Sequence, residues 1–111
     1  ELNLFDAVAQ NGEALAAIGS FAAPFANDTP VTIAVRVGAV EASPSAGQLQ
    51  ARVPSRRFLG DFELAEFAIP GAETLVRAKI RCGALPADAK EVFLNIRKSD
   101  VLVFERSASN V

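Results

Sequence analysis

The feature that most constrains this chain is the alternation of apolar and polar residues along short segments. In residues 31–37 the odd positions form an apolar face, and in residues 48–53 Leu49, Ala51 and Val53 alternate with polar neighbours. Successive side chains of a strand point to opposite faces of its sheet, so this alternation is typical of strands with one buried face. Six prolines and seven glycines are spread between such segments. The chain is therefore predicted to be all-β, with short strands and tight turns.

Prolines and glycines mark where these strands are expected to end. Pro54 lacks a backbone donor and is predicted to interrupt the strand pattern, which resumes at Phe58. Pro70-Gly71 predicts a turn, and residues 86–90 predict a loop or a single helical turn, because Pro86 suits the first position of a short helix. Further strands are predicted in residues 74–82, 92–96 and 101–104, and the tail 107–111 is expected to fray.

A change of parity near the middle of the chain predicts a β-bulge. Phe62 and Leu64 are expected to face inward, but the next large apolar residues, Phe67 and Ile69, have the opposite parity. A bulge or bend near residues 65–66 would bring both pairs to the core. The expected core comprises Ile33, Val35, Leu49, Val53, Phe58, Leu64, Val76, Ile80, Leu94, Val103 and Phe104.

The N-terminal third carries two conflicting signals. Asn11-Gly12 lies between the apolar segments 4–8 and 14–18 and is a strong signal for a type I′ hairpin turn. Residues 13–17 alone have better helix than strand propensity. We favour the hairpin, because Gly19 closes the segment after a few residues and so short a helix is marginal.

The composition excludes several classes of function. A chain of 111 residues, half of them hydrophobic, forms one domain, and its formal charge of −2 gives no basic surface for nucleic acid. Histidine, tyrosine and tryptophan are absent, which removes the usual neutral-pH base and argues against a self-contained enzyme. The single cysteine, Cys82, allows neither an internal disulfide nor a His/Cys zinc site, and it fits a reducing compartment.

The segment Phe58-Leu59-Gly60-Asp61 resembles the Leu-Gly turn of TOBE domains, which are small β-barrels similar to OB-folds in the ATPase subunits of bacterial ABC importers. Asn3-Leu4-Phe5, a strand ending at Arg36 and the terminal segment 100–104 occur in the order found in that family. The resemblance covers nearly the whole chain and is strongest to ferric-iron, spermidine/putrescine and sugar importers. One departure is Arg36-Val37-Gly38, where the family typically has Arg-Pro-Glu.

The resemblance implies that residues 1–111 are a single OB-like barrel, excised from a longer subunit whose nucleotide-binding domain is absent. The implied function is regulatory: two ATPase subunits associate partly through these domains, and effector sensing there is coupled to transport. The implied partners are a second copy of the subunit, its own nucleotide-binding domain and, indirectly, the membrane subunits of the transporter. The location implied is cytoplasmic, peripheral to the inner membrane.

No cofactor is expected in the fragment itself. The resemblance assigns ATP and magnesium to the parent subunit, but this sequence lacks the glycine-rich loop ending in Gly-Lys-Ser/Thr that would hold a triphosphate. The fragment is therefore expected to be non-catalytic.

Two alternatives remain open at this point. One is a sensor that binds a small oxyanion or cation, as molybdate-binding relatives of the family do. The other is a free-standing OB-like module for single-stranded nucleic acid, which the acidic pI near 5.1 and the apolar parity of the phenylalanines do not favour.

Several charged residues have both a functional and a structural interpretation. The row Arg77, Lys79 and Arg81 would suit an anionic ligand, but charges at every second position usually form the solvated face of a strand. Scattered carboxylates could ligate a hard cation, although ordinary surface positions explain them better. They are Asp61, Glu63, Glu66 and Glu91. Gly60 is interpreted as a residue with positive φ at a strand corner that Phe58 and Leu59 anchor in the core.

The expected contact surfaces of a dimer lie in the N-terminal third. Leu2, Leu4 and Phe5 precede a loop that contains Phe21 and Phe25, and these phenylalanines are difficult to place inside one small barrel. An exchange of N-terminal strands between two chains would preserve the same strand pairing. Self-association through this region is therefore predicted.

Overall fold

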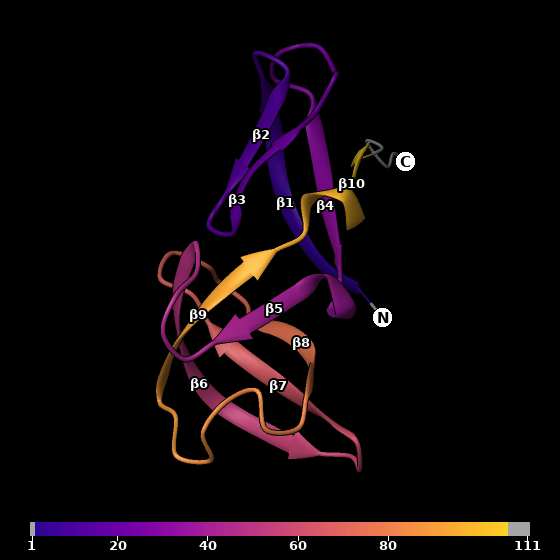
Figure 1. Ribbon diagram of the computed structural model, residues 1–111. Coiled ribbons are helices and arrows are strands. Elements are labelled where there is room, and N and C mark those ends of the chain that lie inside the picture. Colours follow the sequence, from indigo (N-terminus) through magenta and orange to yellow (C-terminus); the bar gives the residue numbers. More distant parts are fainter. Residues whose placement is uncertain (1, 107–111) are drawn as a thin grey trace.

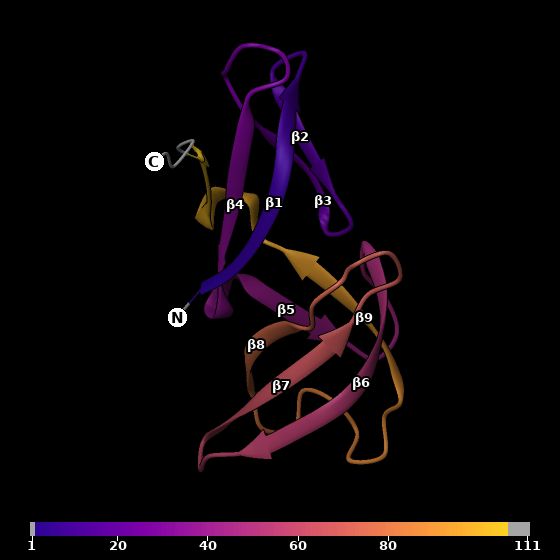
Figure 2. The ribbon, with the colours of Figure 1, turned by 180° about the vertical axis from the view of Figure 1, so that it is seen from behind.

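Within residues 2–106, which the computed structural model describes, ten strands form two five-stranded antiparallel sheets. Each sheet curls into a nearly closed barrel, and the two barrels make an upper and a lower lobe (Figure 1, Figure 2). The all-β, OB-like class predicted from the sequence is confirmed. No helix in the described part of the chain is long and apolar enough to cross a membrane.

The upper lobe combines the two ends of the described chain. Its strand order is β10-β4-β1-β2-β3, so β4 and β1 are central and β10 and β3 are edges. The strands are β1 (Leu2–Gln10), β2 (Glu13–Ala16), β3 (Gly19–Ala22), β4 (Pro30–Arg36) and β10 (Val101–Glu105).

The lower lobe is built from one continuous stretch of chain. Its strand order is β5-β9-β6-β7-β8, which leaves β5 and β8 as edges. The strands are β5 (Val40–Ser43), β6 (Leu49–Phe58), β7 (Phe62–Ala68), β8 (Val76–Arg81) and β9 (Glu91–Ile96).

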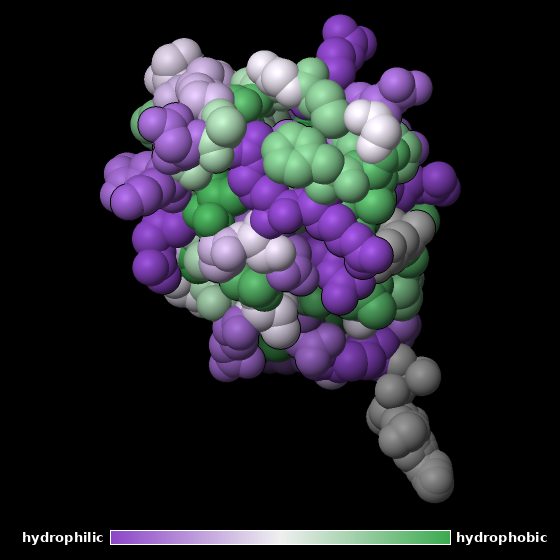
Figure 3. Space-filling view, turned by 90° about the horizontal axis from the view of Figure 1, so that it is seen from below, coloured by the Kyte–Doolittle hydropathy of each residue, from purple (hydrophilic) through white to green (hydrophobic). Residues whose placement is uncertain are grey.

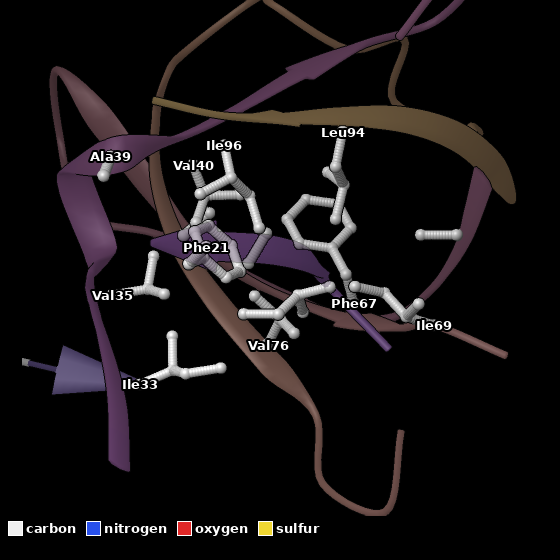
Figure 4. Close-up of a cluster of buried hydrophobic side chains, with 14 of the residues drawn as sticks. Phe21, Ile33, Val35, Ala39, Val40, Phe67, Ile69, Val76, Leu94 and Ile96 are labelled. Atoms are coloured by element: carbon white, nitrogen blue, oxygen red, sulfur yellow. The ribbon is translucent and has the colours of Figure 1, made fainter. Parts of the chain in front are cut away.

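Two short 3₁₀ turns carry the chain between the lobes. The turn η1 (Val37–Ala39) leads from β4 into β5, and η2 (Lys98–Asp100) leads from β9 into β10. Buried side chains from both lobes form one cluster, of which Figure 4 shows Phe21 and Ile33 from the upper lobe with Phe67 and Leu94 from the lower. The lobes therefore share a continuous apolar core.

The hairpin prediction and the main alternating strands are confirmed. Asn11 and Gly12 have φ of 55° and 80°, the left-handed values that a type I′ turn requires, and Gln10 pairs with Glu13. The inward faces of β4, β8 and β9 are buried as predicted. They consist of Val31, Ile33 and Val35, of Val76, Ala78 and Ile80, and of Val92, Leu94 and Ile96.

The predicted bulge at residues 65–66 is wrong. Strand β7 pairs without a register break, and its inward face is Glu63, Ala65 and Phe67, while Leu64 is half-buried on the other side. The parity never changes, because a charged residue, Glu63, occupies an inward position. The register shift lies instead in β6 between Arg52 and Ser55, around Pro54, where an interruption was predicted.

Two phenylalanines expected in the core are exposed. Phe58 is 61% and Phe104 47% exposed, and Leu59 is also on the surface. The interpretation of Phe58 and Leu59 as core anchors of the corner is therefore wrong. The corner itself is as predicted, since Gly60 has φ of +94° with open space around it, so its requirement for glycine is conformational.

Three other expectations concern marginal segments. Leu49, Val53 and Val103 are partly buried and pack against the core. Residues 86–90 form a single turn, with the Ala89 N–H donating to the Pro86 carbonyl at 3.1 Å. The tail 107–111 lies outside the described residues.

Burial separates two phenylalanines that the sequence pattern treats alike. Phe67 is fully buried, so Phe67→Ala is expected to lower the free energy of unfolding by about 3–5 kcal/mol through lost burial and a residual cavity. Phe58→Ala is expected to lower it by less than about 1 kcal/mol. Urea denaturation followed by circular dichroism measures both, and equal losses for the two variants would contradict this assignment of the core.

Candidate functional site

A buried side-chain amide holds the lobes together. Asn3 of β1 donates from Nδ2 to the Arg77 carbonyl of β8 at 2.9 Å, and its Oδ1 accepts from the Arg77 N–H at 2.8 Å. Nδ2 also contacts the Val35 carbonyl at 3.3 Å. The amide therefore satisfies both backbone groups of Arg77 at the edge of the lower sheet, as a peptide group of a neighbouring strand would.

Beside this junction lies a cleft between the lobes with a volume of about 790 Å³, which we call the interlobe cleft. Strand and turn residues of both lobes line it. They include Leu2, Arg36, Gly38, Lys79, Arg97 and Asp100. Arg36 is the last residue of β4 and Arg97 directly follows β9, so the two crossings of the chain place both arginines at the same cleft.

The three cations of the interlobe cleft differ in their partners. Arg97 donates from Nη1 to Asp100 at 2.5 Å and from Nη2 to Glu41 at 3.3 Å, and the Asp100 hydrogen bond chiefly raises the pKa of its guanidinium. The Lys79 ammonium lies 4.2 Å from the centre of the Phe62 ring. Arg36 has no side-chain partner within residues 2–106. Arg36 is thus the cation most available to an anion.

The structure separates the residues of the family motif. Arg36 lines the interlobe cleft, whereas Phe58, Leu59, Gly60 and Asp61 form the tip of the β6–β7 hairpin at the far end of the lower lobe. Figure 3 views this lower end, where apolar residues are interspersed with polar ones. The motif residues therefore do not converge on one site.

An ion pair inside the lower lobe has no counterpart in the sequence analysis. Arg56 donates from Nε to Glu63 at 2.7 Å and from Nη2 to its second oxygen at 2.9 Å. The Arg56 guanidinium also donates to the carbonyls of Leu85 and Pro86, at 3.3 and 2.5 Å. The hydrogen bond to Glu63 raises the pKa of Arg56, against the opposing effect of burial. The pair fastens the loop after β8 to β6 and β7.

The other charged candidates have ordinary surroundings. Arg77 lies 3.6 Å from Glu66 in a half-exposed ion pair, and Glu91 accepts from Gln50 at 3.4 Å. No group of three or more histidine, cysteine, aspartate or glutamate residues in the described range could hold a metal ion. The Cys82 Sγ contacts the Gly60 carbonyl at 3.2 Å. None of these groups forms a constellation for catalysis.

The outer surface of the upper sheet carries exposed apolar side chains on neighbouring strands. Leu4 of β1 and Leu102 of β10 both pair across Ala34 of β4, and Phe104 lies one row further, opposite Thr32. We define the outer apolar face as the set Leu2, Leu4, Val8, Leu102 and Phe104. Each of these side chains is between 44% and 58% exposed.

Only part of the expected dimer surface is on the outside. Leu2 and Leu4 are exposed, but Phe5 and Phe25 are partly buried against the core, and Phe21 is only 4% exposed. The expectation that Phe21 stays outside the core is wrong. Phe21 lies at the end of a third N-terminal strand, β3, which the sequence analysis did not separate from β2. Leu102 and Phe104 were missed as surface residues because their strand was assigned to the core.

Comparison with known proteins identifies a structure of the same fold. Over 94% of this chain and 96% of the other, the structure superposes on the cytoplasmic molybdate-binding protein ModG with a TM-score of 0.72 and 15% sequence identity. No protein-family model and no curated protein sequence matches the chain. This likeness establishes the arrangement of two OB-like lobes.

The junction amide makes a testable contribution to stability. Asn3→Ala leaves the N–H and carbonyl of Arg77 without their partner, so the free energy of unfolding is expected to fall by about 1–3 kcal/mol. The control Asn95→Ala removes an exposed hydrogen bond to the Gln48 N–H and is expected to cost less than about 1 kcal/mol. Urea denaturation measures both, and hydrogen exchange at the Arg77 amide reports the junction directly. An unchanged exchange rate there would contradict the role of Asn3.

Proposed function

We propose that this chain is the regulatory, self-associating domain of an ABC-importer ATPase subunit. The ordered motifs from Asn3 to Phe104 support the family, and the OB-like lobes are compatible with it. The observation that carries the proposal is the outer apolar face, because exposed apolar side chains gathered on one face of a sheet commonly mark a contact with another protein.

The second copy of the chain is the proposed occupant of the outer apolar face. In a two-fold symmetric contact the same patch serves both partners, so it must be self-complementary. Here Leu4 and Leu102 are exposed on either side of Ala34, which is buried between them. The two leucines therefore project from the sheet with a shallow space over Ala34 between them, into which a leucine of the second copy can fit. The Asp6–Arg106 ion pair, 2.7 Å long, adds charges of both signs to the same surface.

The size of the face sets the expected strength of association. Three strands of about seven residues cover roughly 14 by 20 Å, or about 300 Å². A stable protein interface buries about 800 Å² on each partner. The chain alone is therefore expected to associate weakly, with the rest of the parent subunit adding contact area.

Regulation would follow from a difference in this contact between two states of the parent. In the proposed subunit, ATP and magnesium bind the nucleotide-binding domains, which open and close beside the membrane subunits at the cytoplasmic side. An effector that contacts one arrangement of these domains better than the other shifts their populations. The domain described here contributes the association surface and no catalytic group.

Self-association is expected to depend on the outer apolar face. Leu4→Glu and Leu102→Glu place a charge in the proposed contact, so each should weaken dimerisation at least tenfold. Leu59→Glu, an exposed leucine on the hairpin tip, is the matched control and should leave dimerisation unchanged. Sedimentation equilibrium over a hundredfold range of concentration measures the constants. A monomer at millimolar concentration, or equal weakening by all three variants, would overturn the proposal.

A second candidate is the binding of a small oxyanion in the interlobe cleft. Two observations favour it: the fold is shared with a molybdate-binding protein, and the guanidinium of Arg36 has no partner among the described residues. Oxyanions accept hydrogen bonds from guanidinium groups, often through two nitrogens at once.

Calorimetric titration with molybdate, sulfate and phosphate tests this candidate. Arg36→Gln is expected to weaken oxyanion binding about tenfold, because it removes a charge-assisted pair, while Arg57→Gln at the exposed hairpin serves as control. Absence of heat with every oxyanion at millimolar concentration would exclude this second function and leave self-association untouched.

A further inference from the structure

The lower barrel is not closed. Its edge strands β5 and β8 approach each other, with Cα atoms within 8 Å, but no backbone hydrogen bond joins them in the described part of the chain. Paired antiparallel strands have opposite Cα atoms only about 4.5–5.5 Å apart. The backbone groups along this seam therefore lack the strand partners that the rest of the sheet has.

The pairing on each side fixes which groups face the seam. The Arg97 N–H donates to the Ala39 carbonyl at 2.9 Å, so Ala39 and Arg97 form a hydrogen-bonded pair. In an antiparallel strand the backbone groups of successive residues point alternately to the two sides. The N–H and carbonyl groups of Val40 and Ala42 therefore point away from β9 and into the seam. On β8 the backbone groups of Arg77 are taken by Asn3, so by the same alternation those of Lys79 and the N–H of Arg81 also face the seam. The Arg81 carbonyl is already occupied, because it accepts from the Ala84 N–H at 3.1 Å.

A furrow of about 560 Å³ follows the seam, and we call it the β5–β8 furrow. Backbone and side chains of both edges line it. They include Val40, Glu41, Ala42, Lys79, Arg81 and Arg97. Glu41 is bound to Arg97, whereas the guanidinium of Arg81 has no side-chain partner within residues 2–106. The available charge in the furrow is thus positive, from Arg81 and Lys79.

We propose that the β5–β8 furrow binds an extended acidic peptide segment of a partner protein. A peptide backbone supplies alternating donors and acceptors, which can meet the backbone groups of Lys79, the Arg81 N–H and the partly exposed Ala42, whereas Val40 is buried. Asn3 already illustrates this recognition, since its amide pairs with the N–H and carbonyl of Arg77 on the same edge. Carboxylates at alternate positions of the segment would reach Lys79 and Arg81, which are themselves two residues apart.

Size and chemistry favour this ligand over other anions. A tetrahedral oxyanion fills only a small part of the furrow and uses none of its carbonyl acceptors. A phosphodiester backbone only accepts hydrogen bonds, and the net charge of −2 does not favour nucleic acid. Because β5 and β8 lie within 8 Å, the segment lies in the furrow and does not enter as a full central strand, which needs roughly twice the 4.8 Å strand spacing.

Fluorescence anisotropy tests the proposal with a labelled octapeptide of alternating glutamate and threonine and the complete 111-residue chain. Replacing each glutamate by glutamine, or Arg81 by glutamine, is expected to weaken binding three- to tenfold. A peptide N-methylated at alternate residues, which loses its edge hydrogen bonds, should bind at least tenfold more weakly. Arg57→Gln is the matched control, an exposed arginine outside the furrow, and should have no effect.

Several outcomes would overturn the proposal. One is that the N-methylated peptide binds as tightly as the unmodified peptide, and another is that Arg57→Gln weakens binding as much as Arg81→Gln does. The proposal would also be overturned if equimolar phosphate displaced the peptide, or if a chain with its normal circular dichroism spectrum bound no peptide at millimolar concentration. Protection of the Lys79 and Arg81 amides from hydrogen exchange by the peptide would support it. Arg81→Gln is expected to sediment like the unsubstituted chain, because Arg81 lies outside the outer apolar face. The peptide-binding test is therefore separate from the test of self-association.

Discussion

One buried amide, together with the apolar core that the lobes share, sets how the two lobes lie against each other. The edge strand β8 has no strand partner on one side and presents the backbone groups of Arg77 at the lobe boundary, where Asn3 is buried. Asn3 meets both backbone groups of Arg77, so the upper lobe is hydrogen-bonded to the lower lobe beside the η1 crossing, since Asn3 pairs with Val35 just before that turn. A buried polar group without a partner is costly, which makes this arrangement specific as well as stable. The interlobe cleft and the β5–β8 furrow both border this junction and share Lys79 and Arg97.

The fold could be predicted where periodicity alone determines burial. Strands β4, β8 and β9 alternate cleanly, and Asn11-Gly12 fixes a turn whose backbone few other residues adopt. Prediction failed where a charged residue lies inside. Glu63 is buried because Arg56 neutralises it at 2.7 Å, and a partner seven residues away on another strand is invisible to a parity argument. Once Glu63 is placed inward, no bulge is needed and Phe62 and Leu64 take the opposite face.

The candidate site was less accessible to sequence reasoning, because it is made by contacts between lobes. Arg36 was selected from the motif, but its proximity to Arg97 follows from two chain crossings that strand patterns do not specify. Leu2 and Leu4 were placed on the surface, as the structure has them, whereas Phe21 fills the shared core. A terminal strand rich in apolar residues looks like core from sequence. In β10 the odd-numbered side chains, Val101 and Val103, pack against the core, so by alternation Leu102 and Phe104 face outward.

The order of the strands makes the lower lobe an insertion within the upper one. Strands β5 to β9 form one continuous stretch of chain whose first and last strands are neighbours, since Val40 pairs with Ile96. The upper sheet, by contrast, needs β10 to return to β4 across the whole intervening segment. Bringing distant segments together costs loop-closure entropy, and a folded insert with adjacent ends removes most of that cost. The folded lower lobe therefore holds the end of β4 and the start of β10 close together, and in this way aligns the two ends of the chain for pairing in the upper sheet.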